Sequence, residues 1–244
     1  MSDPRRPDTI FWVDPAAVRG DRLTLDAEES HHLLRVHRAR PGTPFVAVDG
    51  AGSTYECVLE SGERGVATGS VTRRVEGRGE PKTSIALLVG LPDPGPTETV
   101  VAHAVPLGVS SIDFVACARG GRPALGAARL GRLSRIAVSA LKQSRRSRLP
   151  SVRSSASLEA GIALLGEGPR VVADPDGLPR PRILDGSAHS HISLAVGPPG
   201  DFTPEEREAL RNAEFEPMSL GCSRLSTETA AIAIVAVIRN YLKQ

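Results

Sequence analysis

Residues 220–230 read Leu-Gly-Cys-Ser-Arg-Leu-Ser-Thr-Glu-Thr-Ala, and residues 230–238 are nine successive apolar residues. Gly221 allows a sharp turn, while Ser226 and Thr227 offer side-chain oxygens to the first free amides of a helix. The apolar run is too short for a membrane span, which needs about 18 residues or more. A helix that is apolar on every side is buried in a core, in a subunit interface or in both. We therefore expect a tight loop fixed to a buried helix, which suits a rigid ligand pocket.

A second glycine loop, Val-Gly-Pro-Pro-Gly-Asp-Phe at residues 196–202, follows the apolar run 192–196. The helix predicted after it begins with Thr203 as N-cap and Pro204 at its first position, and Glu206 completes a capping box. A strand, a turn and a capped helix are common in α/β proteins, and most such turns bind nothing. Two such loops about twenty residues apart are more specific than either loop alone.

The two loops together resemble the C-terminal half of the ribosomal RNA small subunit methyltransferase E family, within the SPOUT superfamily. The resemblance implies a deep trefoil knot that binds S-adenosylmethionine. Knots are otherwise nearly absent from proteins, so periodicity alone does not suggest one. The resemblance assigns cofactor binding to Val196, Gly197, Pro198, Gly200, Leu220, Gly221, Cys222, Leu225, Ser226 and Thr227.

Composition places few other constraints on function. The net charge is only +2, and aromatic residues are 3% of the chain, so the core must consist of Ala, Val, Leu and Ile. The cysteines, Cys57, Cys117 and Cys222, lack C-x-x-C spacing, which argues against a disulfide framework or a zinc site. Residues 1–6 are charged and no apolar segment follows them. We expect a cytoplasmic protein without a metal or a membrane-spanning segment.

Residues 8–78 contain short β-type runs broken by Asp, Gly and Pro, with one helix predicted over residues 27–40. This pattern predicts a small β-barrel. Within it, residues 28–42 read Glu-Glu-Ser-His-His-Leu-Leu-Arg-Val-His-Arg-Ala-Arg-Pro-Gly and resemble the PUA-like RNA-binding domain that opens the same family. Arg35, Arg38 and Arg40 then form a basic arc suited to phosphates. The alternative is an ordinary solvated helix face with structural histidines.

The polar Gly/Pro-rich linker at residues 77–83 divides the chain. We predict a PUA-like domain at residues 1–78 and a SPOUT methyltransferase domain at residues 79–244. The apolar run 85–91 has the length and composition of a parallel strand covered on both faces. Predicted strands and helices alternate from there over about 160 residues, which indicates an α/β domain with a mainly parallel sheet.

Residues 114–158 contain ten basic residues and no Asp or Glu. A segment of one charge repels itself and is suited to facing an anion. Residues 142–146, Lys-Gln-Ser-Arg-Arg, also resemble the Gln-Ser-Gly-Arg segment of the family. The alternative is that these bases pair with acids elsewhere, such as Glu205, Glu206 and Glu208. The RNA-binding residues predicted from both regions are Arg35, Arg38, Arg40, Gln143, Arg145 and Arg146.

The chain departs from the family pattern mainly where that pattern carries charge. Pro199 stands at a glutamate position and Asp201 at a glycine position of the first loop, and Ser223 and Ser226 stand at two arginine positions of the second. The lysines that the family has after its first strand are also missing here. The residues that remain mostly shape the main chain.

The resemblance implies a homodimer that uses S-adenosylmethionine to methylate N3 of a uridine in small-subunit (16S) ribosomal RNA. N3–H is a weak acid, so the site must stabilise the uridine anion, and Arg224 is the candidate catalytic residue. The chief alternative is a catalytically weakened or inactive RNA-binding member of the family. An unrelated nucleotide-using α/β enzyme has less support, because the chain has neither a Walker A nor a G-x-G-x-x-G pattern.

Overall fold

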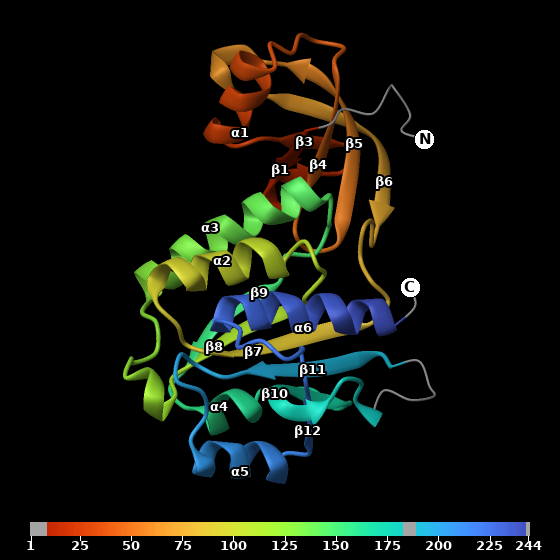
Figure 1. Ribbon diagram of the computed structural model, residues 1–244. Coiled ribbons are helices and arrows are strands. Elements are labelled where there is room, and N and C mark those ends of the chain that lie inside the picture. The colour runs from red at the N-terminus through yellow and green to blue at the C-terminus, as the bar shows by residue number, and fades with distance from the viewer. Residues whose placement is uncertain (1–8, 183–188, 243–244) are drawn as a thin grey trace. The chain divides into compact units, whose positions relative to one another are not determined.

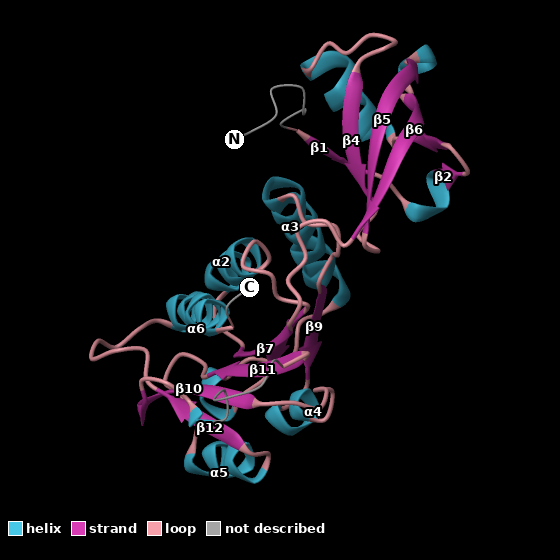
Figure 2. Ribbon diagram, turned by 90° about the vertical axis from the view of Figure 1, so that its right-hand side faces the viewer, coloured by secondary structure: helices cyan, strands magenta, loops and turns pink. Residues whose placement is uncertain are grey.

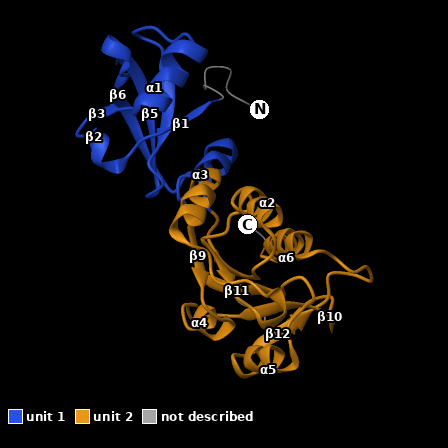
Figure 3. Ribbon diagram, turned by 90° about the vertical axis from the view of Figure 1, so that its left-hand side faces the viewer, with its two compact units in different colours: residues 1–80, 138–149 blue, residues 81–137, 150–244 orange. Residues whose placement is uncertain are grey.

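The computed structural model describes residues 9–182 and 189–242 and divides into two compact units (Figure 3). Unit 1 comprises residues 1–80 and 138–149, and unit 2 comprises residues 81–137 and 150–244. Unit 1 holds a mixed sheet of six strands, and unit 2 holds a parallel sheet of six strands. Among the described residues, no helix has the length and apolar character that a membrane crossing requires.

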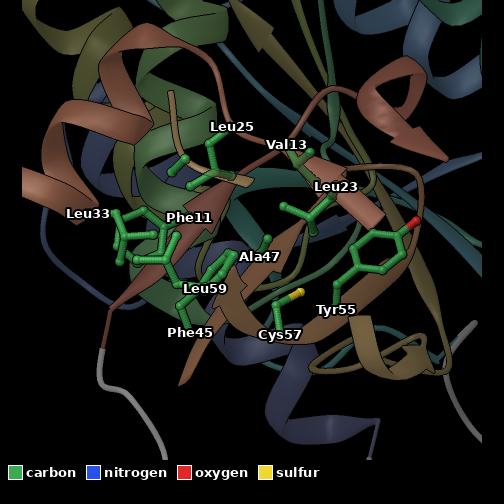
Figure 4. Packing of buried hydrophobic residues seen from close by; sticks show 11 residues of the cluster. Phe11, Val13, Leu23, Leu25, Leu33, Phe45, Ala47, Tyr55, Cys57 and Leu59 are labelled. Carbon is green, nitrogen blue, oxygen red and sulfur yellow. The ribbon is translucent and has the colours of Figure 1, made fainter. Parts of the chain in front are cut away.

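Unit 1 is a half-barrel with its apolar core inside (Figure 4). Its sheet runs in the order β1-β4-β5-β6-β3-β2, antiparallel except for the β1–β4 pair. Phe11, Leu23 and Phe45 are among its fully buried side chains. The elements are β1 (Ile10–Trp12), β2 (Val18–Arg19), β3 (Arg22–Thr24), α1 (Ala27–His31), β4 (Pro44–Val48), β5 (Ser53–Ser61) and β6 (Thr68–Glu76), with short helices η1 (Pro15–Ala17), η2 (His32–Val36) and η3 (Glu63–Gly65).

The helix predicted over residues 27–40 is shorter than expected. Asp26 caps it as predicted, accepting from the Glu29 N–H at 2.8 Å. The α-helical part ends at His31 and continues as the π-helical turn η2. Arg38 then adopts a φ of 53°, a left-handed conformation that ends helices. The sequence predicted where this helix begins but not the change of hydrogen-bonding pattern within it.

Unit 2 is the predicted α/β domain, with α2 and α6 on one face of its sheet and α4 and α5 on the other (Figures 1 and 2). The parallel sheet has the order β12-β10-β11-β7-β8-β9. Its elements are β7 (Ser84–Gly90), α2 (Pro94–Ala104), β8 (Ser111–Val115), η4 (Ala118–Gly120), β9 (Ser151–Ser155), α4 (Leu158–Ile162), β10 (Arg170–Leu178), β11 (His191–Val196), α5 (Pro204–Asn212), β12 (Phe215–Met218) and α6 (Thr227–Tyr241), while α3 (Ala127–Ser144) continues from unit 2 into unit 1.

Residues 145–149 follow α3 and are bound to the rest of unit 1. The Arg146 guanidinium, whose side chain is 4% exposed, lies 2.8 Å from Glu80 Oε2. Glu80 Oε1 accepts from the main-chain N–H groups of Ser147 and Arg148, each at 2.8 Å. Two further main-chain bonds, from Gly52 N to Ser147 O and from Leu149 N to Gly50 O, join this segment to the β4–β5 turn. These bonds explain why the segment belongs to unit 1.

Glu80→Ala should lower the free energy of unfolding by about 3 kcal/mol, because the buried Arg146 guanidinium loses this countercharge. Urea denaturation measures the change. The control is Glu60→Ala, since Glu60 pairs with the exposed Arg22 at 3.2 Å. A surface pair of that kind contributes less than about 1 kcal/mol. Equal losses in the two variants would contradict a structural role for Glu80.

Candidate functional site

A pocket of about 630 Å³ lies beyond the carboxyl ends of β7, β11 and β12 in unit 2. Parallel α/β sheets bind ligands at this edge, because the loops that follow the strands converge there. Four segments line it, at residues 92–96, 173–175, 196–201 and 220–230. The ten residues assigned to cofactor binding from the sequence all line the pocket, and so does Arg224. Its volume lies within the range of about 300–1,000 Å³ that is usual for small-molecule sites.

The first loop, residues 196–202, makes a tight turn. The Asp201 N–H donates to the Pro198 carbonyl oxygen at 2.8 Å, and Gly200 between them has a φ of 91°. Proline followed by a glycine of positive φ is the residue pair that a type II turn favours. Pro199 therefore suits the geometry of this turn.

The same loop lies directly against the end of β7. A Cβ atom on Gly90 would lie 2.3 Å from the Pro198 nitrogen, and real Cβ atoms essentially never come so close to another atom. Only glycine permits this approach of two main chains. Phe202, which is 3% exposed, packs with Leu88 and Val115 in the core on the other side of the loop. The loop is therefore held between a strand end and the core.

Hydrogen bonds from η4 and α5 fix the far end of this loop. Arg119 Nη1 donates to the carbonyl oxygens of Gly200 at 3.0 Å and Phe202 at 3.2 Å. Thr203 and Glu206 form the predicted capping box at the start of α5. Glu206 Oε1 also accepts from the Ala118 N–H at 2.8 Å. The role of Arg119 could not be predicted from the sequence, because its partner atoms lie more than eighty positions away.

The two loops are joined by one side chain. Thr227 Oγ1 donates to the Gly197 carbonyl oxygen at 3.0 Å, and Thr227 is the first residue of α6. Ser226 is the N-cap of this helix and accepts from the Thr229 N–H, as predicted. Gly221 has a φ of 116°, which side chains of L-residues rarely adopt. Thr227 and Gly221 therefore shape the second loop.

The second loop leaves main-chain groups available to a ligand. Within the described part of the chain, the main-chain N–H groups of residues 222–225 donate to no other atom of the protein. Around them the pocket has apolar walls from Pro92, Pro96 and Leu220. Main-chain donors beside apolar surface suit a nucleoside ligand, whose base needs both hydrogen bonds and stacking area.

The charged residues of the lining are mostly neutralised by arginines outside it. Asp93 pairs with Arg122, and Asp174 and Asp201 both pair with Arg207. Arg224 is exposed, and Glu228 is half-buried. Among the described residues, neither of these two makes an ion pair. Arg224 is also the one basic residue of the lining.

Asp93, Asp174 and the prolines beside them line the pocket but were not predicted from the sequence. Asp93 follows the strand predicted at residues 85–91, and Asp174 lies within β10 of the α/β domain. The rule that ligands bind at the carboxyl ends of parallel strands would have selected both segments.

Comparison with known proteins places the pocket in a domain of known family. A family model described as an RNA methyltransferase domain matches residues 79–239, which is most of the chain and all of the pocket. The chain belongs to the RNA methyltransferase family. A second model, an RNA methyltransferase PUA domain, matches residues 25–68 in unit 1. Both matches confirm the family that the sequence motifs indicated.

Individual relatives agree with this membership. Ribosomal RNA small subunit methyltransferase E of Mycobacterium bovis is 28% identical over 246 residues, covering 94% of this chain and 90% of its own. A probable rRNA-methyltransferase from Porphyromonas gingivalis is 30% identical, with a TM-score of 0.82 and coverage of 96% and 98%. A ribosomal RNA small subunit methyltransferase E from Neisseria gonorrhoeae, bound to S-adenosyl methionine, has the same fold, at 24% identity, a TM-score of 0.81 and coverage of 95% and 97%. The fold is therefore the predicted SPOUT type with a PUA-like domain.

The RNA-binding residues predicted for this methyltransferase all lie in unit 1. Arg35, Arg38 and Arg40 are exposed and, among the described residues, have no ion-pair partner. Gln143 and Arg145 are exposed near the end of α3. The prediction that Arg146 binds RNA is corrected, because its side chain is buried and its guanidinium pairs with Glu80 of the same chain.

The basic segment 114–158 is less positive in the structure than in the sequence. Among the described residues, at least five of its ten bases form ion pairs: Arg122 with Asp93, Arg132 with Glu98, Lys142 with Glu29, Arg146 with Glu80, and Arg153 with Asp113. Arg119 binds main-chain carbonyls instead. The alternative, that these bases pair with acids elsewhere, therefore holds for at least half of them, and the acids in these five pairs are other than Glu205, Glu206 and Glu208.

Gly90→Ala should destabilise the protein by about 1–3 kcal/mol, because the added Cβ forces the loop at Pro198 away from β7. The matched control is Gly95→Ala in α2, where an added Cβ meets nothing within 4 Å. That change should be neutral, or stabilising by up to about 1 kcal/mol. Chemical denaturation of both variants makes the comparison, and a stable Gly90→Ala protein would contradict the close approach.

Proposed function

We propose that this protein transfers a methyl group from S-adenosylmethionine to N3 of a uridine in small-subunit (16S) ribosomal RNA. The observation that carries the proposal is the pocket between the two glycine loops, within a domain of the RNA methyltransferase family. Relatives over most of the chain's length are ribosomal RNA small subunit methyltransferases E. We further propose residues 1–78 as the RNA-binding domain and residues 79–244 as the methyltransferase domain.

The cofactor fits the residues that line the pocket. The free main-chain N–H groups of residues 222–225 can bond a nucleoside, and Pro92, Pro96 and Leu220 provide apolar contact. Around the Cβ position of Gly221 there is no atom within 4 Å, so the main chain is open to a ligand there. When bound, S-adenosylmethionine supplies an electrophilic methyl group.

The protein must then prepare the uridine. Methylation at N3 would break the N3–H bond, with the proton passing to water, and the electron pair left on nitrogen would form the new N–C bond. The methyl–sulfur bond of the cofactor would break at the same time, and the cofactor would leave as the neutral thioether. Negative charge spreads onto the ring oxygens as the proton leaves, and a fixed positive group lowers the energy of that state. Arg224 is the one basic residue of the lining, and we assign it this role. Ser223 and Ser226 beside it are neutral.

The second candidate function is an RNA-binding protein of this family with weak or no catalysis. The observation that favours it is the charge of the lining, which has four acidic residues and one basic residue. Three of the acids are paired with arginines. Those arginines lie outside the lining, and their charge is already used in these pairs. The two candidates therefore differ in the contribution of Arg224.

We propose that the protein acts in the cytoplasm as a homodimer. The support is α6, where apolar residues remain half-buried along one side, Ile232, Ala233, Ala236 and Val237 among them. A second subunit would cover such a surface. Sedimentation velocity tests this part of the proposal, and a monomer at micromolar concentration would contradict it.

Arg224→Ala should slow methyl transfer by roughly a hundredfold to a thousandfold, because one charge-stabilising donor is worth about 3–4 kcal/mol of barrier. The affinity for S-adenosylmethionine should barely change. The assay follows labelled methyl groups onto small ribosomal subunits that lack the modification, with calorimetry for the cofactor.

The control for Arg224→Ala is Arg211→Ala, an exposed arginine of α5 that does not line the pocket. This variant should retain full activity. Equal rates for wild type and Arg224→Ala would rule out the assigned role. No transfer by the wild type, despite bound cofactor, would support the non-catalytic candidate.

Binding to ribosomal RNA should depend steeply on salt, with log affinity falling by roughly 0.7–0.9 per neutralised phosphate per decade of salt. Arg35→Glu combined with Arg40→Glu should weaken binding and reduce this slope by about two such contacts. Arg19→Glu, at an exposed position of the same unit, is the control. Filter binding across a salt series measures all three, and an unchanged slope would remove the basic arc from the interface.

A further inference from the structure

Asp201 has a main-chain conformation that residues other than glycine adopt only in a few per cent of cases. Its φ is 67°, in the left-handed region where glycine is favoured and aspartate is uncommon. The residue stands at the end of the first pocket loop, two positions before the N-cap of α5. A conformation of this kind persists where surrounding contacts hold it. The contacts of the Asp201 carboxylate are therefore informative.

Arg207, in the second turn of α5, provides the main contact. Its guanidinium bonds Asp201 Oδ2 with Nη2 and Asp174 Oδ2 with Nη1. Asp174 belongs to β10 and lines the pocket from another side. Arg207 itself does not line the pocket. One side chain outside the pocket thus connects two of the four segments that form its wall.

The other oxygen of Asp201 fixes the turn from within. Asp201 Oδ1 accepts from the Phe202 N–H at 2.7 Å. The same oxygen would lie 2.8 Å from a Cβ on Gly197, so the carboxylate lies over the beginning of the loop. The Asp201 N–H closes the turn by donating to the Pro198 carbonyl oxygen. The direction of one carboxylate therefore sets the shape of the loop from residue 197 to residue 202.

We propose that Arg207 is a positioning residue, which holds the loop 197–202 in its ligand-binding shape by binding Asp201 and Asp174 together. The role deepens the proposed function and rests on it, because the ligand in question is S-adenosylmethionine. A lone surface ion pair does little, but a guanidinium has a fixed fork of donors that can hold two carboxylates at once. Arg207 does not line the pocket itself and contacts its wall through the side chains of Asp201 and Asp174, so its effect on the loop 197–202 passes through Asp201.

The test is a double-mutant cycle of Arg207→Ala and Asp201→Gly. Arg207→Ala should weaken S-adenosylmethionine binding by roughly fivefold to tenfold, raising its KM while leaving kcat nearly unchanged. Asp201→Gly alone should weaken binding by no more than Arg207→Ala does, because it removes the same contact while glycine adopts a positive φ without support. In the Asp201→Gly protein, removal of Arg207 should cause little further loss. Arg207→Lys should restore part of the affinity, since an ammonium keeps the charge without the fork.

The control is Arg211→Ala, one turn further along α5, where the arginine pairs with Glu208 at the surface. This variant should bind normally. Equal losses from Arg207→Ala in both backgrounds would overturn the proposal, because the effect would then bypass Asp201. A loss of binding in Asp201→Gly much larger than that in Arg207→Ala would also overturn it, since Asp201 would then contact the ligand itself.

A second readout separates this inference from the proposed function. Hydrogen–deuterium exchange of the peptide covering residues 196–203 reports loop order without any ligand. Exchange should be faster in Arg207→Ala and unchanged in Arg211→Ala. If the wild type binds no cofactor but exchange responds in this way, the proposed function fails and the positioning role of Arg207 stands. Unchanged exchange in Arg207→Ala would contradict the role of Arg207.

Discussion

The hydrogen bond from Thr227 to the Gly197 carbonyl oxygen joins two loops that are thirty positions apart in the chain. The pocket depends on this junction, because one loop ends the buried strand β11 and the other begins the buried helix α6. Glycines allow the main chains to approach, most closely where Gly90 meets Pro198. The site is therefore formed largely by main-chain geometry, and Pro199 and Asp201 are parts of the turn that follows Pro198.

Most of the charged side chains that line the pocket are paired with arginines outside the lining. Acidic residues of the lining are bound by arginines that lie behind the wall, so Asp93, Asp174 and Asp201 serve structure more than recognition. In the proposed reaction, the positive sulfonium of the cofactor and the negative uridine anion need electrostatic potentials of opposite sign at neighbouring positions. Arg224 is exposed in the second loop and has no ion-pair partner among the described residues. An arginine in this position can serve a reacting base.

Much of the fold could be predicted from the sequence, and the failures have physical causes. The buried strands β7 and β11 and the capping box of α5 were predicted, because continuous apolar runs and cap residues are local signals. The edge strands β9 and β12 were missed, since β12 contains Pro217 and β9 is rich in serine. All ten residues predicted to bind the cofactor line the pocket. The roles of Arg207 and Arg119 could not be predicted, because no motif marks Arg207 and because the partners of Arg119 are distant in the sequence. The prediction that Arg146 binds RNA did not account for its burial, because the sequence of a basic segment does not show which of its side chains are buried.

The most direct test of the account is a calorimetric titration with S-adenosylmethionine of the wild type and of Gly221→Val and Gly65→Val. Both glycines have a positive φ and open surroundings, but only Gly221 lines the pocket. If the cofactor binds in this pocket, the wild type and Gly65→Val should each bind one cofactor per chain, and a folded Gly221→Val protein should show no measurable binding. Normal affinity in folded Gly221→Val, or no binding by the wild type, would contradict it.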